Sequence, residues 1–264
     1  MSRGGEMVYI PDDSDFSSFR AQCESQEGWH CCYNKAGITV WSQGQEESCT
    51  VQKIKTRLCC KDVPAETLYD VLHDTPYRKK WDSNMLETHD IGRLTANADV
   101  GYYSWKCPSP LKNRDFVTLR SWLPLDDDYI IINYSVKHPK YPPRKDFVRA
   151  VSLQTGYLIK ANGAGGCVLY YLTQVDPRDT RWGEGLVPSV PTQAMKKLYK
   201  AGLKYPEWKR QHDPGYKPWV YPEQSTLPSL SLAELSLQHA ASLEHIDEAE
   251  LPEEEQLSAS DHEA

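Results

Sequence analysis

The segment from Lys112 to Trp122 constrains the fold more than any other part of the chain, because it reads as a long β-strand with a charge at a core position. Its alternation places Phe116, Thr118, Arg120 and Trp122 on one face. If that face is buried, the Arg120 guanidinium needs an acid, a set of acceptors or a bound anion, because an unpaired buried charge is costly. If the face meets water, the strand is ordinary. The alternation alone leaves both interpretations open.

The patterns on either side of this strand predict an α+β chain built on one long antiparallel sheet. Asp12 and Asp13 precede an apolar spacing at Phe16, Phe19 and Cys23, which predicts an amphipathic helix that begins with acids. The predicted strands cover residues 29–34, 37–43, 49–60, 86–93, 99–107, 114–124, 128–137, 147–160 and 166–175. Most of their links are short, which favours antiparallel neighbours.

Two short helices interrupt the predicted strands. A proline-containing cap at residues 62–64 opens the first, and Asp74-Thr-Pro76 opens the second. In the second helix, Tyr77, Trp81 and Met85 are spaced to share one face. The predicted order is therefore a helix, strands, two helices, strands and a final helix.

The final helix is predicted from Pro191 to about His212, and an acidic tail follows it. We expect a flexible N-terminus over residues 1–10, one domain over 11–212, and a largely disordered tail over 213–264. The whole chain has a net charge of -7, of which the tail carries -11 and the rest +4. A capping-box pattern inside the tail predicts a short helix over 231–246. Whether this helix docks, binds a partner or forms only transiently stays open.

The sequence offers no catalytic or metal-binding constellation. It lacks the GxSxG, GxxxxGK[ST] and HExxH motifs, and its eight cysteines form no CxxC pair. We therefore predict a non-enzymatic protein with reduced thiols, no metal and no cofactor. Residues 1–9 lack the apolar core of a signal peptide, and no apolar run is long enough to cross a bilayer. A cytoplasmic monomer without a nucleic-acid partner is expected.

Arg78 is the second arginine whose surroundings matter. Asp82 follows it at i+4, a spacing that favours a surface helix pair worth a few tenths of a kcal/mol. Arg78 also lies beside Tyr77 and Trp81 on a mostly buried helix, where its planar fork could face a phosphate while Asp82 holds it. The pattern alone favours the surface pair.

At these residues the chain resembles a known family. The segment DTPYRKKWD at 74–82, and the run NRDFV at 113–117 with Arg120 after it, resemble the signature of START domains, lipid-transfer modules related to steroidogenic acute regulatory protein. Within that family the chain is most similar to the phosphatidylcholine-transfer subgroup, over about residues 8–250. The resemblance implies a helix-grip (START) fold, in which a curved antiparallel sheet of about nine strands surrounds a lipid tunnel covered by the C-terminal helix.

The resemblance also implies roles for individual residues. Arg78 would hold the phosphate of one bound phospholipid, with Asp82 beside it. Tyr103 and Phe116 would form part of an aromatic cage around a choline ammonium, which is cation-π recognition.

Arg120 matches an inward arginine that pairs with a buried acid in sterol-binding relatives. The neighbouring predicted strand offers Tyr103, Trp105 and Cys107 to the interior and no acid. We therefore expect backbone or hydroxyl oxygens, water or the ligand to satisfy Arg120.

The chain departs from the family pattern around the head group. Trp105 replaces a small apolar residue, Leu153 replaces a tyrosine, and Leu72 and Thr155 replace two polar groups near the phosphate. The choice between phosphatidylcholine and phosphatidylethanolamine therefore stays open. The predicted lipid-binding residues are Arg78, Asp82, Tyr103, Trp105, Phe116, Arg120, Leu153 and Thr155.

The largest departure precedes the final helix. Two glycines and two prolines in the segment from Trp182 to Pro191 replace the usual helical opening, which predicts a covering helix shorter by about two turns. The first hypothesis is phospholipid transfer between membranes without chemistry. The alternative is a lipid-sensing interaction protein that transfers poorly because this helix is altered, with residues 231–246 binding a partner.

The tunnel mouth is predicted where the final helix meets loops 108–113 and 138–145. Reversible membrane association is expected there, because basic side chains attract anionic lipid heads. The predicted docking residues are Lys140, Tyr141, Arg144, Lys196, Lys197, Lys200 and Lys204. Ser258 and Ser260 each have an acid three residues on, so we expect acidophilic kinases to phosphorylate them and weaken docking.

Overall fold

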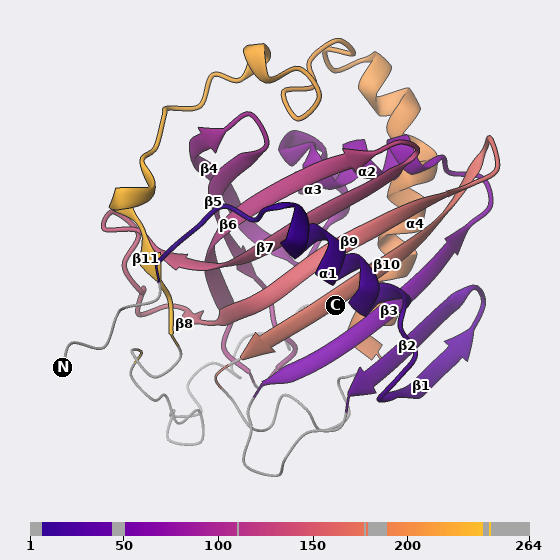
Figure 1. The fold of residues 1–264 in the computed structure, drawn as a ribbon, viewed down its shortest axis with the longest axis horizontal. Coiled ribbons are helices and arrows are strands. Elements are labelled where there is room, and N and C mark those ends of the chain that lie inside the picture. Colours follow the sequence, from indigo (N-terminus) through magenta and orange to yellow (C-terminus); the bar gives the residue numbers. More distant parts are fainter. Residues whose placement is uncertain are drawn as a thin grey trace, which may run out of the picture.

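A computed structural model describes residues 7–43, 51–109, 111–176, 178, 189–239 and 243 of the 264-residue chain. Figure 1 shows a strongly curved sheet at the centre, with α1 across one face and the long helix α4 on the other. The helices are α1 (Asp13–Glu24), α2 (Ala65–His73), α3 (Thr75–Trp81) and α4 (Ser189–Arg210), with short 3-10 turns at Pro222–Gln224 and Leu232–Glu234. This is the α+β helix-grip arrangement that the sequence predicts.

The sheet follows one continuous path of nine strands in the order β1-β2-β3-β10-β9-β7-β6-β5-β4, and neighbours on it pair antiparallel. Short strand β8 pairs with β6, and β11 pairs with β7. The strands are β1 (Trp29–Lys35), β2 (Ile38–Gln43), β3 (Gln52–Cys60), β4 (Met85–Thr95), β5 (Ala98–Trp105), β6 (Arg114–Leu125), β7 (Asp128–Lys137), β8 (Val148–Arg149), β9 (Val151–Asn162), β10 (Gly166–Asp176) and β11 (Ser236–Leu237). The predicted count of about nine is confirmed.

The helices begin where the sequence places capping residues. Asp12 caps α1 and forms a capping box with Asp15. The Asp74 carboxylate accepts a hydrogen bond from the Tyr77 backbone at 3.2 Å and so starts α3. The prediction that Met85 continues this helix is wrong, because Asp82 leaves the helical region and Met85 already begins β4.

Alternation along the strands divides the core between the two faces of the sheet. On β7, Ile130 and Ile132 pack with α1, whereas Ile131 packs with the cluster that includes α2 and α4. Helix α4 lies very close to α2, because a Cβ added at Gly202 would be only 3.0 Å from the Leu68 side chain. This close packing fixes α4 over the concave side.

Residues 213–239, which we call the strap, run back along the molecule after α4 (gold in Figure 1). The Trp219 indole donates to Asp70 at 2.7 Å, and the Lys217 ammonium donates to the same carboxylate at 2.6 Å. Further on, the backbone of Arg93 on edge strand β4 exchanges hydrogen bonds with the strap at Pro228 and Leu230, both at 2.8 Å.

Near its end the strap contains β11, which pairs with β7. Leu235, directly before β11, is buried. The prediction of disorder is therefore wrong for residues 213–239. The capping box at Ser231 forms, but it opens only the 3-10 turn Leu232–Glu234 and not a helix over 231–246. Residues 240–242 and 244–264 lie outside the described part of the chain.

Candidate functional site

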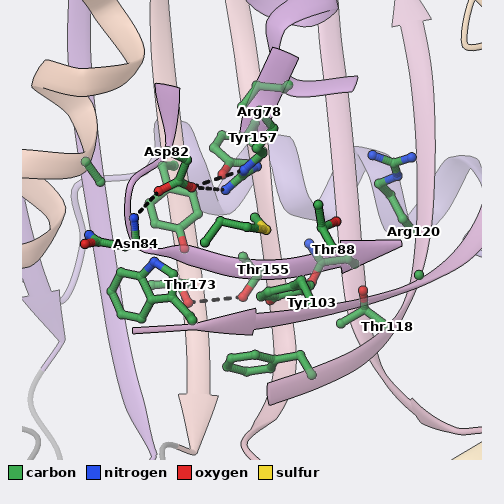
Figure 2. Close-up of a pocket in the computed structure, with 18 of the residues that line it drawn as sticks. Arg78, Asp82, Asn84, Thr88, Tyr103, Thr118, Arg120, Thr155, Tyr157 and Thr173 are labelled. Carbon is green, nitrogen blue, oxygen red and sulfur yellow. Dashed lines mark hydrogen bonds and ion pairs between the residues drawn. The ribbon is translucent and has the colours of Figure 1, made fainter. Parts of the chain in front are cut away.

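A cavity of about 300 Å³ lies between the concave side of the sheet and helices α3 and α4. Figure 2 shows its polar residues, with Arg78 and Asp82 together and Arg120 well apart from them. Met195 and Leu198 face it from α4, and Ile131 faces it from the sheet. The wall is thus partly apolar and partly charged, which suits an amphipathic ligand.

Arg78 presents a positive group to this cavity. Its Nε and Nη2 atoms both lie 3.2 Å from Asp82 Oδ2, and the other Asp82 oxygen accepts from the Asn84 backbone. The Trp81 ring lies 5.4 Å from the guanidinium carbon. The Arg78 side chain keeps 28% of its surface accessible although it lines the cavity. Asp82 therefore orients a guanidinium whose remaining N–H groups can meet an anion.

Two stacked aromatic pairs flank this charge. Tyr103 on β5 and Phe116 on β6 are cross-strand neighbours, with ring centroids 4.9 Å apart. Tyr157 and Tyr171 stack at the same centroid distance across β9 and β10. Burial raises the pKa of the Tyr103, Tyr157 and Tyr171 phenols, so all three hydroxyls stay neutral.

Tyr157 and Tyr171 were not among the predicted site residues. Tyr157 lies two positions after Thr155 on β9, so the alternation of that strand could have identified it. Tyr171 pairs directly with Tyr157 in the register of β9 and β10. Its position in the site depends on strand pairing, which the sequence alone does not specify.

The structure brings most of the predicted site together. The predicted residues that line the cavity are Arg78, Asp82, Tyr103, Trp105, Phe116, Arg120 and Thr155. Leu153 does not line it and is 45% exposed, so its placement in the site is wrong. The reason is a bulge: Gln154 and Ser152 pair with consecutive residues of β10, which leaves Leu153 as the extra residue.

Arg120 has the acid that the sequence analysis did not find. Its Nε and Nη2 atoms donate to the two oxygens of Asp99, at 3.0 and 2.7 Å. The expectation that oxygens of the backbone, hydroxyls, water or ligand satisfy Arg120 is therefore wrong. Asp99 is the direct cross-strand partner of Arg120, and it shares the inward alternation of Tyr103. Asp99 lies four positions before Tyr103 on one strand, and this even spacing could have identified it as an inward residue from the sequence.

The inward interpretation of the Lys112 to Trp122 strand is correct, because Phe116, Thr118 and Arg120 all line the cavity. Asp90 on β4 lines it too, and burial raises the pKa of this carboxyl. The interior therefore contains two arginine–aspartate pairs and a further acid.

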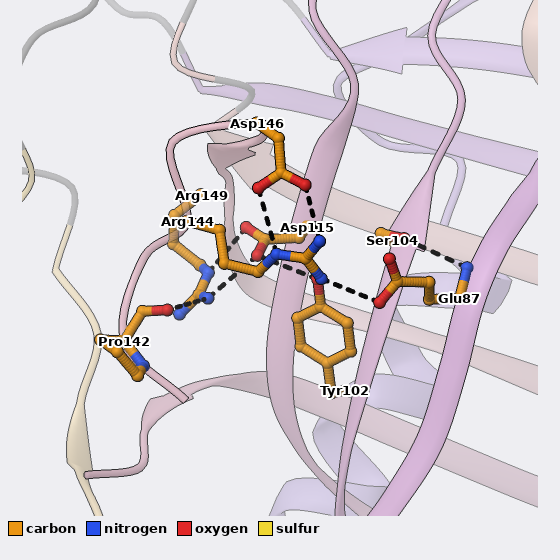
Figure 3. A network of polar contacts seen from close by, with 8 residues as sticks. All are labelled: Glu87, Tyr102, Ser104, Asp115, Pro142, Arg144, Asp146 and Arg149. Atoms are coloured by element: carbon orange, nitrogen blue, oxygen red, sulfur yellow. Dashed lines mark hydrogen bonds and ion pairs between the residues drawn. The ribbon is translucent and has the colours of Figure 1, made fainter. Parts of the chain in front are cut away.

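The loop at 138–146 is held by ion pairs, as Figure 3 shows. Arg149 and Asp115 form a buried pair at 2.8 and 3.0 Å, and Arg149 also donates to the carbonyls of Tyr141 and Pro142. Arg144 donates to Asp146 at 2.6 Å and to Glu87 at 2.8 Å. Two carboxylates already pair with Arg144, and its role in membrane docking stays a prediction.

The other predicted docking residues differ in exposure. Tyr141 is half-buried, with its ring 5.3 Å from His89 and 5.4 Å from His138, so it packs against the body. Lys197 lines the cavity and donates to the Ser83 hydroxyl at 2.8 Å. The exposed lysines among them are Lys140, Lys196, Lys200 and Lys204. Ser258 and Ser260 lie outside the described residues, as do residues 179–188, on which the predicted shortening of the covering helix depends.

The fold and the cavity together define a protein that encloses an amphipathic ligand between a curved sheet and a C-terminal helix. The START domain model matches residues 13–203, and the chain belongs to this family. START domain-containing protein 10 from Mus musculus is 63% identical over 257 residues, which cover 95% of this chain and 87% of the relative.

Two further comparisons agree with this assignment. The crystal structure of human STARD10 matches with a TM-score of 0.83 and 63% identity, covering 90% of this chain and 98% of that one. Phosphatidylcholine transfer protein from Rattus norvegicus is 26% identical over 160 residues, which cover 58% of this chain and 73% of the relative. No helix in the described part of the chain combines the length and apolar character of a membrane span.

Proposed function

We propose that this protein binds one phospholipid, phosphatidylcholine or phosphatidylethanolamine, in its cavity and transfers it between membranes without chemical change. The observation that carries the proposal is Arg78, an arginine held by Asp82 whose accessible surface faces a cavity with a partly apolar wall. The planar guanidinium fork of an arginine matches the geometry of a phosphodiester. The name of the phosphatidylcholine transfer relative supports the same ligand class.

The ammonium of the head group would meet the stacked rings of Tyr103 and Phe116. Both rings face the cavity, and a ring face attracts a cation whether or not it carries a hydroxyl. This recognition admits a choline and an ethanolamine head alike. The acyl chains would lie along the apolar wall that Ile131, Met195 and Leu198 provide.

Ligand exchange would open the N-terminal half of α4. The other end of this helix is anchored, because Tyr205 and Lys209 both donate to the buried Asp74 at 3.0 and 3.1 Å. The exposed lysines Lys196, Lys200 and Lys204 lie along the same helix and could meet anionic lipid heads during a reversible membrane contact. Nothing in the comparisons favours the alternative of a lipid sensor without transfer.

The test is native mass spectrometry of the purified protein, followed by transfer of labelled phosphatidylcholine and phosphatidylethanolamine between vesicles. One phospholipid per chain is expected. In Arg78→Gln, the loss of a charge-assisted hydrogen bond costs about 1.5–3 kcal/mol, so transfer should fall at least about tenfold. The matched control is Arg20→Gln, which removes an arginine from α1 that pairs with Asp128 on the other face. Equal lipid content and transfer in both variants would refute the proposal.

A further inference from the structure

A second cavity, of about 340 Å³, lies on the opposite face of the sheet from the lipid cavity. The C-terminal end of α1 borders it, and strands β1, β2, β3 and β10 form its floor. On β3, Ile54 faces the lipid cavity, whereas Lys55 and Arg57 face the second one. The second cavity is lined by Cys23, Glu24, Ser25, Gln26, Cys31, Asn34, Thr39, Trp41, Lys55, Arg57 and Tyr170.

Lys55 is a buried cation without a carboxylate partner in the described part of the chain. Only 2% of its surface is accessible, and its ammonium donates to the carbonyls of Gln22 and Ser25 at the end of α1. The Trp29 and Trp41 rings lie 4.4 and 5.3 Å from it. Carbonyl dipoles and ring faces reduce the cost of burying this charge, but they carry no net negative charge.

No other described group supplies that negative charge. Burial raises the pKa of the Cys23 thiol to about 12, so it stays neutral. Glu24 also lines the cavity, but its carboxylate is already paired with Lys160 and Arg20. Since burial also lowers the pKa of Lys55, the ammonium is held in an environment that disfavours its charge.

Arg57 adds a second positive charge beside the first. It is half-buried, and its side chain makes no hydrogen bond or ion pair with any residue that the structure describes. In the sheet register it lies in one row with Asn34, Thr39 and Tyr170, and all four line the cavity. The Thr39 hydroxyl donates to the side-chain oxygen Oδ1 of Asn34 at 3.2 Å, which leaves the N–H groups of the Asn34 side-chain amide as donors.

We propose that this cavity binds a compact phosphate-bearing anion, held by the Arg57 guanidinium and by the third N–H of Lys55. A phosphate has enough terminal oxygens to accept from the guanidinium, the ammonium and the Asn34 amide together. Trp41 and Tyr170 form walls on which a small organic body can rest. Because the site lies on the other face of the sheet, it is separate from the phospholipid cavity and its occupancy does not depend on the proposed transfer function.

The test measures binding of inorganic phosphate to the full chain by isothermal titration calorimetry. Saturable binding to the native protein is expected, and Arg57→Gln should weaken it at least about tenfold. Lys53→Gln is the matched control, because Lys53 lies on the same strand and over the Trp29 ring but does not line the cavity. It should change the affinity by less than about twofold.

A second measurement reads binding from the native protein, and a variant serves only to assign one signal. In ¹H–¹⁵N spectra, the Trp41 indole signal, assigned through Trp41→Phe, should shift in proportion to the phosphate bound. Glycerol 3-phosphate and vesicles containing phosphatidic acid then distinguish a soluble phosphate ester from a lipid head group. The proposal is overturned if phosphate does not saturate, if Trp41 does not respond, or if Lys53→Gln weakens binding as much as Arg57→Gln.

Discussion

His73 is a histidine enclosed in an aromatic box. Its ring centroid lies 4.6 Å from that of Tyr69, 4.8 Å from that of Trp122 and 5.7 Å from that of the strap residue Trp219. Neither ring nitrogen has a hydrogen-bond partner among the described residues. Burial, together with the nearby Arg120 charge, lowers the pKa of His73 well below its usual value. The native state therefore keeps this imidazole neutral.

The consequence is a stability that falls in acid. Below about pH 6.5 the unfolded chain binds a proton at His73, whereas the native state does not. The free energy of unfolding therefore decreases by up to about 1.4 kcal/mol for each pH unit that the solution is acidified. His73→Phe should fill the box and remove this contribution. Urea unfolding of both proteins at several values between about pH 7 and pH 5 measures it. Parallel pH profiles of the two proteins would show that His73 is not responsible.

Individual charged residues mark the limit of what the sequence could predict about the site. Arg78 and Asp82 are one helical turn apart, so their pairing follows from local geometry. Arg120 and Asp99 are 21 positions apart and meet only through the register of β5 and β6. The sequence shows that both face inward once the strands are known. It does not show which residues face each other across them.

At the scale of single elements, β4 shows that an alternating pattern predicts the presence of a strand better than it predicts which of its residues line the cavity. Its pairing with β5 shifts register between Met85 and Glu87 and again between Asp90 and Gly92. Met85, Thr88 and Asp90 therefore all line the cavity, although their spacing is not strictly alternating. Bulges are set by the partner strand, so the predicted strand at 86–93 was correct while its contribution to the site was missed.

Strand β9 requires a glycine where α1 crosses the sheet. A Cβ at Gly156 would clash with the Ile131 carbonyl oxygen and would lie 2.8 Å from the Phe19 ring. Gly156→Ala should therefore destabilise the protein by about 2 kcal/mol or more, because neither the backbone nor the ring can move without disturbing the core. Thermal or urea unfolding measures the loss.

Gly165 in the turn between β9 and β10 provides the control for this prediction. A Cβ there would meet nothing within 4 Å, and its backbone is not in the left-handed region. Gly165→Ala should change stability by less than about 0.5 kcal/mol. If the two variants unfolded alike, close packing of α1 on β9 would not be what selects glycine at position 156.

At the scale of the whole molecule, the strap extends the ordered body beyond the residues that match the family model, which end at 203. Its composition predicted disorder, because proline, serine and acids dominate the tail. Order comes from a few specific anchors: Trp219 against His73, the backbone bonds to edge strand β4, and the buried Leu235. An averaged composition cannot reveal such anchors, since each depends on a surface that exists only after the sheet has formed.

The strap should therefore contribute to stability and to solubility. Ending the chain after His212 would expose the box around His73, the cluster that Leu235 covers and the unpaired edge of β4. We expect a loss of at least about 3 kcal/mol, which lowers the melting temperature by about 6–12 °C for a domain of this size, together with association through the edge strand. Ending the chain after His239 keeps every anchor named here and should melt within about 2 °C of the full chain. Calorimetry and light scattering after gel filtration compare the three proteins. A chain ending at His212 that stayed monomeric and melted with the others would mean that the strap only rests on the surface.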